Sequence, residues 1–236
     1  MTGYSLRIIL GAWLLMAMIG GCSPEEPKYY DNNTLRVPGV RWDVPPQVIY
    51  RIDGHRFVSL EDYRKCYGDV FYNDTQKHLH THLFEDRPTN YRGHLIIDDP
   101  SGMNIVIPTA DPGPCDDHTC AVPAIYSTDG GQTFTWMYYI ERSTNPPRDS
   151  EDYTIAVTKD RFYVKKLWGI HDPSVGEYPL LPGIDLTKPY PPGVHGSGFA
   201  ESKRPHFLDG LRTPSGQDRF ICDESIEPSN WPQKMP

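Results

Sequence analysis

The chain of 236 residues has room for one domain of ordinary size or two small ones, and its hydrophobic content of 38% is compatible with a packed core. Its 24 prolines, 20 glycines and 15 tyrosines favour turns and strands over long helices, which argues against a helical bundle. The formal charge of -8 counts against a protein that binds the phosphate backbone of a nucleic acid.

The first residues have the layout of a secretory signal peptide. Arg7 precedes an uninterrupted apolar run from Ile8 to Ile19, and the small residues Gly20 and Gly21 follow. The run is shorter than the roughly 20 residues that a membrane-spanning helix needs. We therefore predict that residues 1–21 are a cleaved signal peptide.

The end of this leader, Ile19-Gly20-Gly21-Cys22, resembles a bacterial lipobox. The resemblance implies that Cys22 is acylated and becomes the mature N-terminus. Ser23 follows the cysteine where an aspartate would imply retention at the inner membrane, so the resemblance implies an outer-membrane anchor with the folded part facing the periplasm. The polar, proline-bearing stretch that follows is expected to be a tether, and we assign residues 22–46 to the acylated N-terminus and tether.

Four further cysteines, an even number, suit disulfide bonds in an oxidising compartment. Cys115 and Cys120 flank a short loop, which favours pairing them and leaves Cys66 to pair with Cys222. The second bridge would connect the start of the folded region with its end. The alternative is a zinc site formed by Cys115, His118, Cys120 and one more ligand, but three ligands within six residues would be crowded.

Short apolar runs separated by turn residues predict antiparallel hairpins. Asp53-Gly54 separates two such runs. Lys159-Asp160 separates two runs in which apolar and polar residues alternate, as they do in a sheet with one solvent-exposed face. The expected strand pairs are 47–52 with 55–60, 94–97 with 103–107, 124–126 with 134–140, and 153–158 with 161–167, and residues 61–67 are expected to form one helical turn. The predicted fold class is all-β, a sandwich, barrel or propeller-like sheet within a single domain at residues 47–236.

Residues 171–219 have a different character, because proline and glycine are frequent and apolar residues occur singly or in pairs. Loops of this length are uncommon unless they are functional or disordered. One interpretation is an irregular wrap that covers a sheet edge. The other is a preformed loop that binds a protein partner, with five candidate anchors: Tyr178, Leu180, Leu181, Tyr190 and Phe199.

The segment from Ser127 to Phe134 resembles the Asp-box of sialidases and other propellers, SxDxGxT followed by an aromatic residue. In this pattern the aspartate accepts hydrogen bonds from backbone N–H groups of a tight hairpin, and glycine permits a positive φ. One clear copy is present, and a propeller repeats the motif over a much longer chain. We interpret it as a device that fixes one hairpin.

Two other groups of polar residues could carry chemistry. His78, His80 and His82 alternate, so in a strand they would share a face and could bind zinc together with His94, but a partly exposed face of hydrogen-bonded histidines is the favoured interpretation. Paired carboxylates could serve a glycosidase, but each pair lies beside turn residues, which favours solvated loops. These are Asp98 and Asp99, Asp116 and Asp117, and Asp149 with Glu151 and Asp152. We predict no catalytic residue, metal site or cofactor.

The lipobox, the acidic tether and the run from Gly93 to Tyr139 together resemble the immunity lipoproteins that accompany type VI secretion phospholipase effectors. The resemblance extends from about Val48 to Cys222. It implies a protein that is not an enzyme, faces the periplasm, and binds a lipase toxin so that the producing cell and its sisters are protected. The alternatives are a lipid-anchored hydrolase, suggested by the Asp-box and the carboxylates, and a lipoprotein of envelope assembly.

Overall fold

The computed structural model describes residues 39–111, 115–116 and 118–231. The chain divides into two units, residues 1–31 and 32–236. The predicted signal peptide and Cys22 lie outside the described residues. Among the residues that are described, no helix has the length and apolar character needed to cross a membrane.

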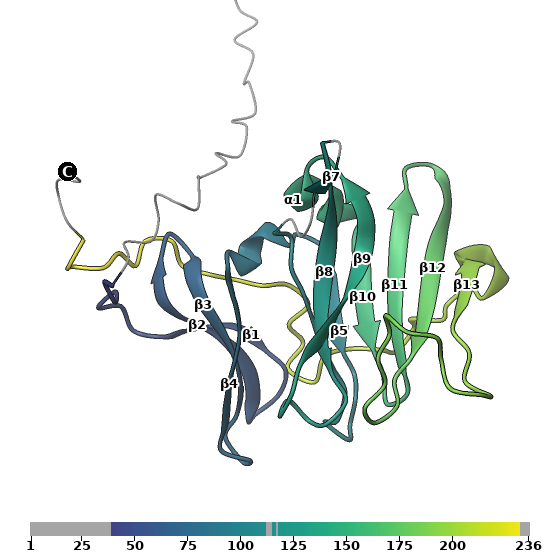
Figure 1. Ribbon diagram of the computed structural model, residues 1–236, viewed down its shortest axis with the longest axis horizontal. Coiled ribbons are helices and arrows are strands. Elements are labelled where there is room, and N and C mark those ends of the chain that lie inside the picture. Colours follow the sequence, from purple (N-terminus) through teal and green to yellow (C-terminus); the bar gives the residue numbers. More distant parts are fainter. Residues whose placement is uncertain (1–38, 112–114, 117, 232–236) are drawn as a thin grey trace, which may run out of the picture. The chain divides into compact units, whose positions relative to one another are not determined.

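The first sheet, sheet A, is a four-stranded antiparallel meander (Figure 1). Its strands are β1 (Gln47–Arg51), β2 (Arg56–Arg64), β3 (Tyr67–Asp74) and β4 (Leu79–Asp86). The hairpin predicted around Asp53-Gly54 is confirmed as β1–β2. The helical turn predicted at residues 61–67 is wrong, because β2 continues through a bulge to Arg64 and positive φ values at Lys65 (50°) and Cys66 (61°) turn the chain directly into β3.

The second sheet, sheet C, contains β6 (Ile105–Pro108), β7 (Cys115–Asp116), β8 (Thr119–Ser127) and β9 (Thr135–Ser143). The predicted β8–β9 hairpin is confirmed. Its turn is the Asp-box, where Asp129 accepts hydrogen bonds from the backbone N–H of Gln132 and Thr133, each at 3.0 Å. Gly131 lies so close to the Tyr72 ring that a Cβ there would come within 2.1 Å, so this turn also packs sheet C against sheet A.

The third sheet, sheet B, has the order β13-β12-β11-β10-β5. Its strands are β5 (His94–Ile97), β10 (Tyr153–Val157), β11 (Arg161–Trp168), β12 (His171–Pro179) and β13 (Ser197–Ala200). The predicted hairpin at residues 153–167 is confirmed. The pairing predicted for residues 94–97 and 103–107 is wrong, because β5 pairs in parallel with β10 whereas β6 pairs with β8.

The turn between β5 and β6 explains that error. The Asp99 carboxylate accepts hydrogen bonds from the backbone N–H of Ser101, Met103 and Asn104, and this turn carries the chain from one sheet to another instead of returning it along its own strand. The helical elements are single short turns: η2 (Pro88–Asn90), α1 (Pro146–Asp149), η3 (Ser150–Asp152) and η4 (Glu201–Lys203).

Sheets B and C face each other across one hydrophobic core, as in the predicted all-β sandwich. The Tyr139 ring of β9 and the Tyr153 ring of β10 contact edge to face at 5.3 Å between centroids. Sheet A joins the same core through Tyr50, which is fully buried and donates a hydrogen bond to the carbonyl oxygen of Leu95 on β5 at 2.8 Å. Burial raises the Tyr50 pKa, which keeps its hydroxyl protonated.

The packed unit begins before the predicted boundary at residue 47. Trp42 is buried, its backbone N–H donates to Asp62 at 2.5 Å, and its ring contacts Trp231. The tether predicted to extend to residue 46 therefore ends earlier, because residues 42–45 are already held against the fold.

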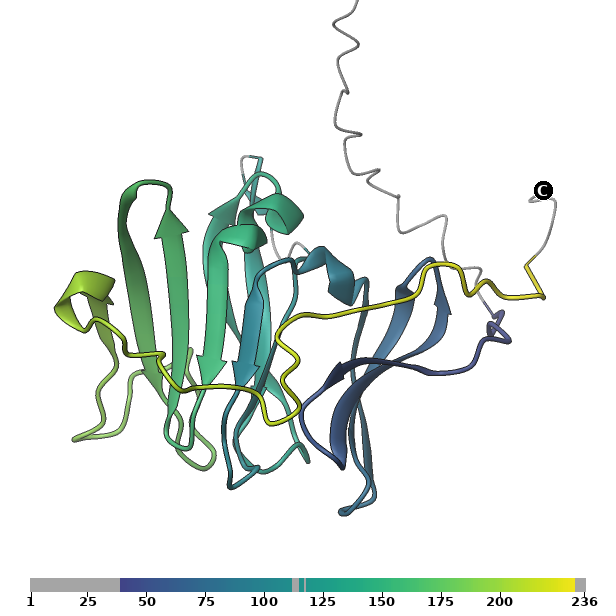
Figure 2. The same ribbon diagram turned by 180° about the vertical axis from the view of Figure 1, so that it is seen from behind.

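The irregular segment expected at residues 171–219 contains two strands, β12 and β13, which the sequence did not predict. The irregular part nearest the C-terminus, residues 213–231, is named the C-terminal clamp here. Figure 2, the view from the back, shows it in yellow crossing in front of sheets B and A. It covers the outer edges of β1 and β5: Ile221 N–H donates to the Ile49 carbonyl, and Leu95 N–H donates to the Asp218 carbonyl.

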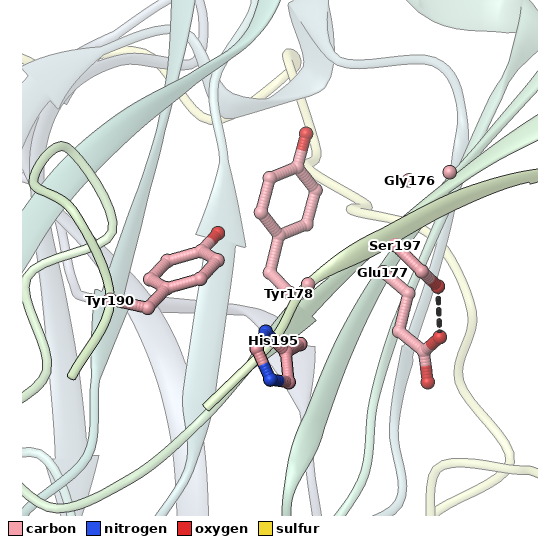
Figure 3. A pocket seen from close by; sticks show the side chains of 8 residues that line it. Gly176, Glu177, Tyr178, Tyr190, His195 and Ser197 are labelled. Atoms are coloured by element: carbon pink, nitrogen blue, oxygen red, sulfur yellow. Dashed lines mark hydrogen bonds between the residues drawn. The ribbon is translucent and has the colours of Figure 1, made fainter. Parts of the chain in front are cut away.

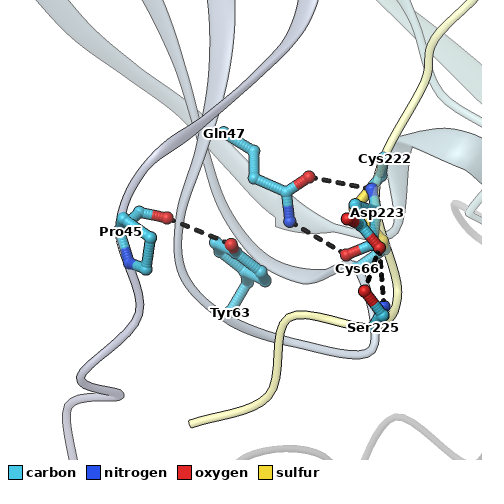
Figure 4. Close-up of a disulfide and its surroundings, with 7 residues drawn as sticks. All are labelled: Pro45, Gln47, Tyr63, Cys66, Cys222, Asp223 and Ser225. Carbon is cyan, nitrogen blue, oxygen red and sulfur yellow. Dashed lines mark hydrogen bonds between the residues drawn. A yellow bond between two sulfur atoms is a disulfide. The ribbon is translucent and has the colours of Figure 1, made fainter.

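A disulfide fixes the clamp to sheet A. Cys66 at the β2–β3 turn is bonded to Cys222, across a sequence separation of 156 residues (Figure 4). Beside it the Gln47 side-chain amide exchanges two hydrogen bonds with the backbone of Asp223, at 2.8 and 3.1 Å. The predicted long-range pairing is therefore present, and it joins the first sheet to the end of the described chain.

Candidate partner-binding surface

An open groove of about 490 Å³ lies where β12 and β13 meet the segment that connects them (Figure 3). Tyr178, Tyr190 and His195 line it together with Glu177, Ser197 and three glycines. A Cβ on Gly176 would lie 3.0 Å from the Tyr178 ring, and a Cβ on Gly196 would lie 3.0 Å from the Tyr190 ring. Glycine at these positions therefore lets both rings rest against the backbone. Burial raises the pKa of both tyrosines, so both hydroxyls stay protonated.

An ion-pair network borders the groove at Glu177 and Ser197. Glu177 accepts hydrogen bonds from Arg204 and Ser197 and pairs with Arg161 at 3.2 Å. The Arg204 hydrogen bond, followed by that of Ser197, lowers the Glu177 pKa to about 2. The Arg204 guanidinium also lies 3.7 Å from the centre of the Phe199 ring. The network therefore forms a closed face beside the groove, held by its own side chains.

The turn between β11 and β12 exposes three large apolar side chains. Leu167 is 42% exposed, Trp168 49% and Ile170 99%, and we call residues 167–170 the hairpin tip. Gly169 has a φ of 58°, which permits the tight reversal. The Trp168 indole donates to the Ser174 hydroxyl at 2.8 Å, and the Lys166 ammonium lies 3.7 Å from the centre of the Trp168 ring.

The predicted Cys115–Cys120 disulfide is also present, with a Cα–Cα distance of 4.0 Å. It closes the short β7–β8 hairpin, in which Cys115 and Asp116 are exposed. Cys120 pairs with Ser143 on β9, and the Ser143 hydroxyl donates to Asp149 at 2.6 Å. Asp149 in turn lines a hollow with Trp168. This loop is therefore connected through Ser143 to Asp149, which borders the same hollow as the hairpin tip.

Residues 42–166 match the model of a protein family described as T6SS Tli3 immunity protein, where T6SS denotes the type VI secretion system. The match covers more than half of the chain. This chain belongs to the Tli3 immunity family. No curated protein matches it. As a member of the family it is a type VI secretion immunity protein that binds a cognate effector toxin, and the family indicates an inhibitor rather than an enzyme.

The match to the Tli3 family begins at the buried Trp42 and ends within β11. It therefore spans sheets A and C, and strands β5, β10 and most of β11 in sheet B. The hairpin tip, the groove and the C-terminal clamp all lie beyond residue 166. The sequence resemblance was expected to extend to Cys222, whereas the family match ends at residue 166.

The structure separates the five anchor residues that the sequence suggested for this immunity protein. Tyr178 and Tyr190 meet in the groove, but Phe199 lies on the opposite face of the sheet beside Arg204. Leu181 is exposed in the turn after β12. Leu180 is only 3% exposed and belongs to the core, so it offers a partner no surface and we remove it from the candidate contacts.

The histidines of β4 have individual hydrogen-bonding partners. The His80 ring stacks on Phe71 with centroids 4.2 Å apart and contacts the Asn73 side chain at 2.8 Å. His82 pairs with Asp69 at 3.3 Å, and His94, on another sheet, pairs with Asp218 at 2.8 Å. Within residues 39–111, 115–116 and 118–231, no group of three or more His, Cys, Asp or Glu side chains could hold a metal ion.

The carboxylates singled out in the sequence mostly stabilise turns. Asp99 and Asp129 accept backbone hydrogen bonds, as described above, and Glu151 pairs with Arg92 at 2.8 Å. Burial raises the Asp129 pKa, but hydrogen bonds from Thr133, Ser127 and Gln132 outweigh this effect and the net pKa is lowered. Asp117 lies outside the described residues.

The sequence prediction did not identify the hairpin tip. Its residues Leu167, Trp168, Gly169 and Ile170 were a usable signal, because three large apolar residues and a glycine lie where a strand ends.

Proposed function

We propose that this immunity protein is a lipid-anchored inhibitor of a phospholipase effector, held on the periplasmic side of the outer membrane. The observation that carries the proposal is the match of residues 42–166 to a family of type VI secretion immunity proteins. Three features of the sequence refine it: the signal-like leader, the lipobox-like Ile19–Cys22, and a framework of two disulfides, which suits an oxidising compartment.

The proposed mechanism is occlusion of the toxin. A scaffold closed by disulfides loses little conformational freedom on binding, so more of its contact energy remains as affinity. Loops on such a scaffold cover the mouth of the lipase active site or hold its lid closed. We place these loops in residues 171–219, which include the groove, and in the Cys115–Cys120 hairpin. The lipid anchor raises the concentration of inhibitor at the membrane where the toxin acts.

The test combines the full chain with a phospholipase effector of the same strain, directed to the periplasm. We expect the wild-type chain to form a stoichiometric complex, to abolish lipase activity and to restore growth. The Cys22→Ser variant lacks the thiol that is predicted to be acylated, so it cannot carry the lipid anchor. We expect it to leave the membrane fraction and to protect cells less well, with unchanged inhibition of the purified toxin.

Three outcomes would contradict parts of the proposal. A complex with a type VI effector that is not a phospholipase, and with no phospholipase, would disprove the target class. An unchanged membrane fraction for Cys22→Ser would disprove the anchor. Growth defects in a deletion strain that meets no toxin would favour a role in envelope assembly instead.

A further inference from the structure

The hairpin tip concentrates exposed apolar surface in a way that no other described segment does. Eight large hydrophobic side chains are exposed in the described residues, and three of them fall within residues 167–170. The others, such as Trp136 on β9 and Ile221 in the clamp, are separated along the sequence. Single exposed apolar residues are ordinary on protein surfaces, but a contiguous group commonly marks an interaction site.

The tip is also held in one conformation before any partner binds. Trp168 pairs with His171 across the turn, its indole is hydrogen-bonded to Ser174, and Lys166 covers its ring. A tryptophan fixed in this way contributes a large contact area with little loss of side-chain entropy. Tryptophan is among the residues that most often dominate the binding energy of protein interfaces.

Carboxylates surround the tip. Asp149 and Asp152 line a hollow of about 260 Å³ together with Trp168, and Asp172 follows two residues after Ile170. Lys166 lies over the Trp168 ring, and the chain as a whole has a formal charge of -8. The tip is therefore an apolar projection beside which carboxylates outnumber the cations Lys166 and Arg148. An anionic bilayer would repel this arrangement, whereas a cleft with a basic rim would attract it.

A phospholipase needs both an apolar and a cationic surface to bind its substrate, and these two surfaces are complementary to the apolar tip and its neighbouring carboxylates. Its substrate has apolar acyl chains and an anionic phosphate, so the cleft that binds it must combine an apolar channel with cationic or hydrogen-bond-donating groups. An apolar tip with carboxylates beside it presents the same combination of chemistry. The tip starts immediately after the segment that the family model covers, so it is a part of the chain that can be specific to one effector.

We propose that the hairpin tip, residues 167–170, inserts into the acyl-chain cleft of the cognate phospholipase effector, with Asp149 and Asp152 facing its basic rim. The inference rests on the proposed function and identifies the contact within it. The tip takes the place of a substrate acyl chain, so inhibition is competitive with phospholipid.

The test measures binding and inhibition with the full chain immobilised on a sensor surface and a water-soluble, short-chain phospholipid as substrate. We expect Trp168→Ala and Ile170→Asp each to raise the Kd for the effector by at least about 30-fold, the loss that defines an interface hot spot. Trp136→Ala is the matched control, because Trp136 is 47% exposed on another sheet, and its Kd is expected to stay within about threefold of wild type.

The charge contribution is tested separately with Asp152→Asn. We expect a several-fold slower association at low salt that disappears at about 0.5 M salt, because rim charges act mainly on the association rate. Short-chain phospholipid at saturating concentration is expected to displace the wild-type chain from the effector. Unchanged thermal unfolding midpoints for all variants would show that these changes are not caused by unfolding.

The outcomes separate this inference from the proposed function. If the wild-type chain inhibits the phospholipase but the tip variants inhibit it equally well, the tip is not the anchor and the proposed function stands. If the tip variants bind the toxin normally in solution but fail to protect cells, the tip contacts the membrane and the inference is wrong. If the wild-type chain binds no phospholipase, both this inference and the proposed function are wrong.

Discussion

Two irregular stretches of this chain, residues 180–196 and the C-terminal clamp at 213–231, have different structural roles. Both contain scattered apolar residues, but proline and glycine are frequent only in residues 180–196. The clamp covers the backbone edges of two sheets, contributes the buried Thr213 and is bonded to sheet A through the Cys66–Cys222 disulfide. Residues 180–196 connect β12 to β13 and leave an open groove beside them.

The roles differ in what each stretch covers. Strand edges have unpaired N–H and C=O groups, and the clamp satisfies those of β1 and β5 through bonds such as Ser215 N–H to the Ile52 carbonyl. Near its end, Asp43 accepts hydrogen bonds from Ser229, and Arg64 lies 3.5 Å from the centre of the Trp231 ring. Residues 180–196 are held differently: Leu180 and Ile184 are buried in the core, whereas Tyr190 stays at the open groove and is available for recognition.

The largest expected effect tests whether the clamp holds the fold. Replacing Cys66 and Cys222 by serine releases a loop closed over 156 residues, and the chain-entropy model predicts a loss of about 4–5 kcal/mol of unfolding free energy. Replacing Cys115 and Cys120 by serine opens a loop of 5 residues and should cost about 2 kcal/mol or less. Denaturant unfolding under non-reducing conditions measures both, and equal losses would contradict the special role of the clamp.

A smaller effect is expected when one hydroxyl is removed from the clamp. Thr213 Oγ1 accepts from the Ile97 N–H at 3.1 Å and shares a hydrogen bond with the Tyr50 hydroxyl at 2.7 Å. Thr213→Val leaves that buried N–H without an acceptor, so we expect a loss of about 1–3 kcal/mol. Thr187→Val in the exposed stretch is the control, with an expected change within about 0.5 kcal/mol. A comparable loss from both variants, measured by urea unfolding, would remove the distinction.

The smallest effect concerns the closed face beside the groove. The folded-state pKa of Glu177 is about 2, below its unfolded value near 4.5, so its ion pairs stabilise the fold above about pH 4.5 and this contribution disappears as the pH falls towards 2. We expect Glu177→Gln to reduce the dependence of stability on pH within this window and to change little above it. Unfolding free energies at pH 6, 4 and 3 test this, and an unchanged dependence would show that Glu177 is not the responsible group.

Local sequence signals predicted the parts of the fold that local chemistry controls. The Asp53-Gly54 turn, the Asp-box and the alternation in β10 and β11 each depend on neighbouring residues, and each predicted hairpin formed. The parallel pairing of β5 with β10 could not be predicted in this way, because it depends on a partner about 60 residues away. The bulge at residues 61–64 misled the analysis, since it interrupts the alternation that marks a strand.

The candidate binding surface was harder to predict for a similar reason. Tyr178 and Tyr190 were identified from their positions in an irregular segment, and the structure brings them together. Leu180 has the same type of local context as Leu181, yet one is buried and the other exposed because only one faces the core. Trp168 and Ile170 fell between the predicted strand at 161–167 and the irregular segment at 171–219, although together they form one projection.

The clamp has a consequence for the order in which the chain can fold. The edges of β1 and β5 receive their partners from residues 213–223, so the sandwich cannot be completed until almost the whole polypeptide is available. Such long-range closure slows folding, because the chain must lose entropy before the contacts form. A chain interrupted before residue 213 would leave two open strand edges able to pair with other copies. Shortening this protein from its C-terminus should therefore produce aggregates rather than a smaller soluble domain.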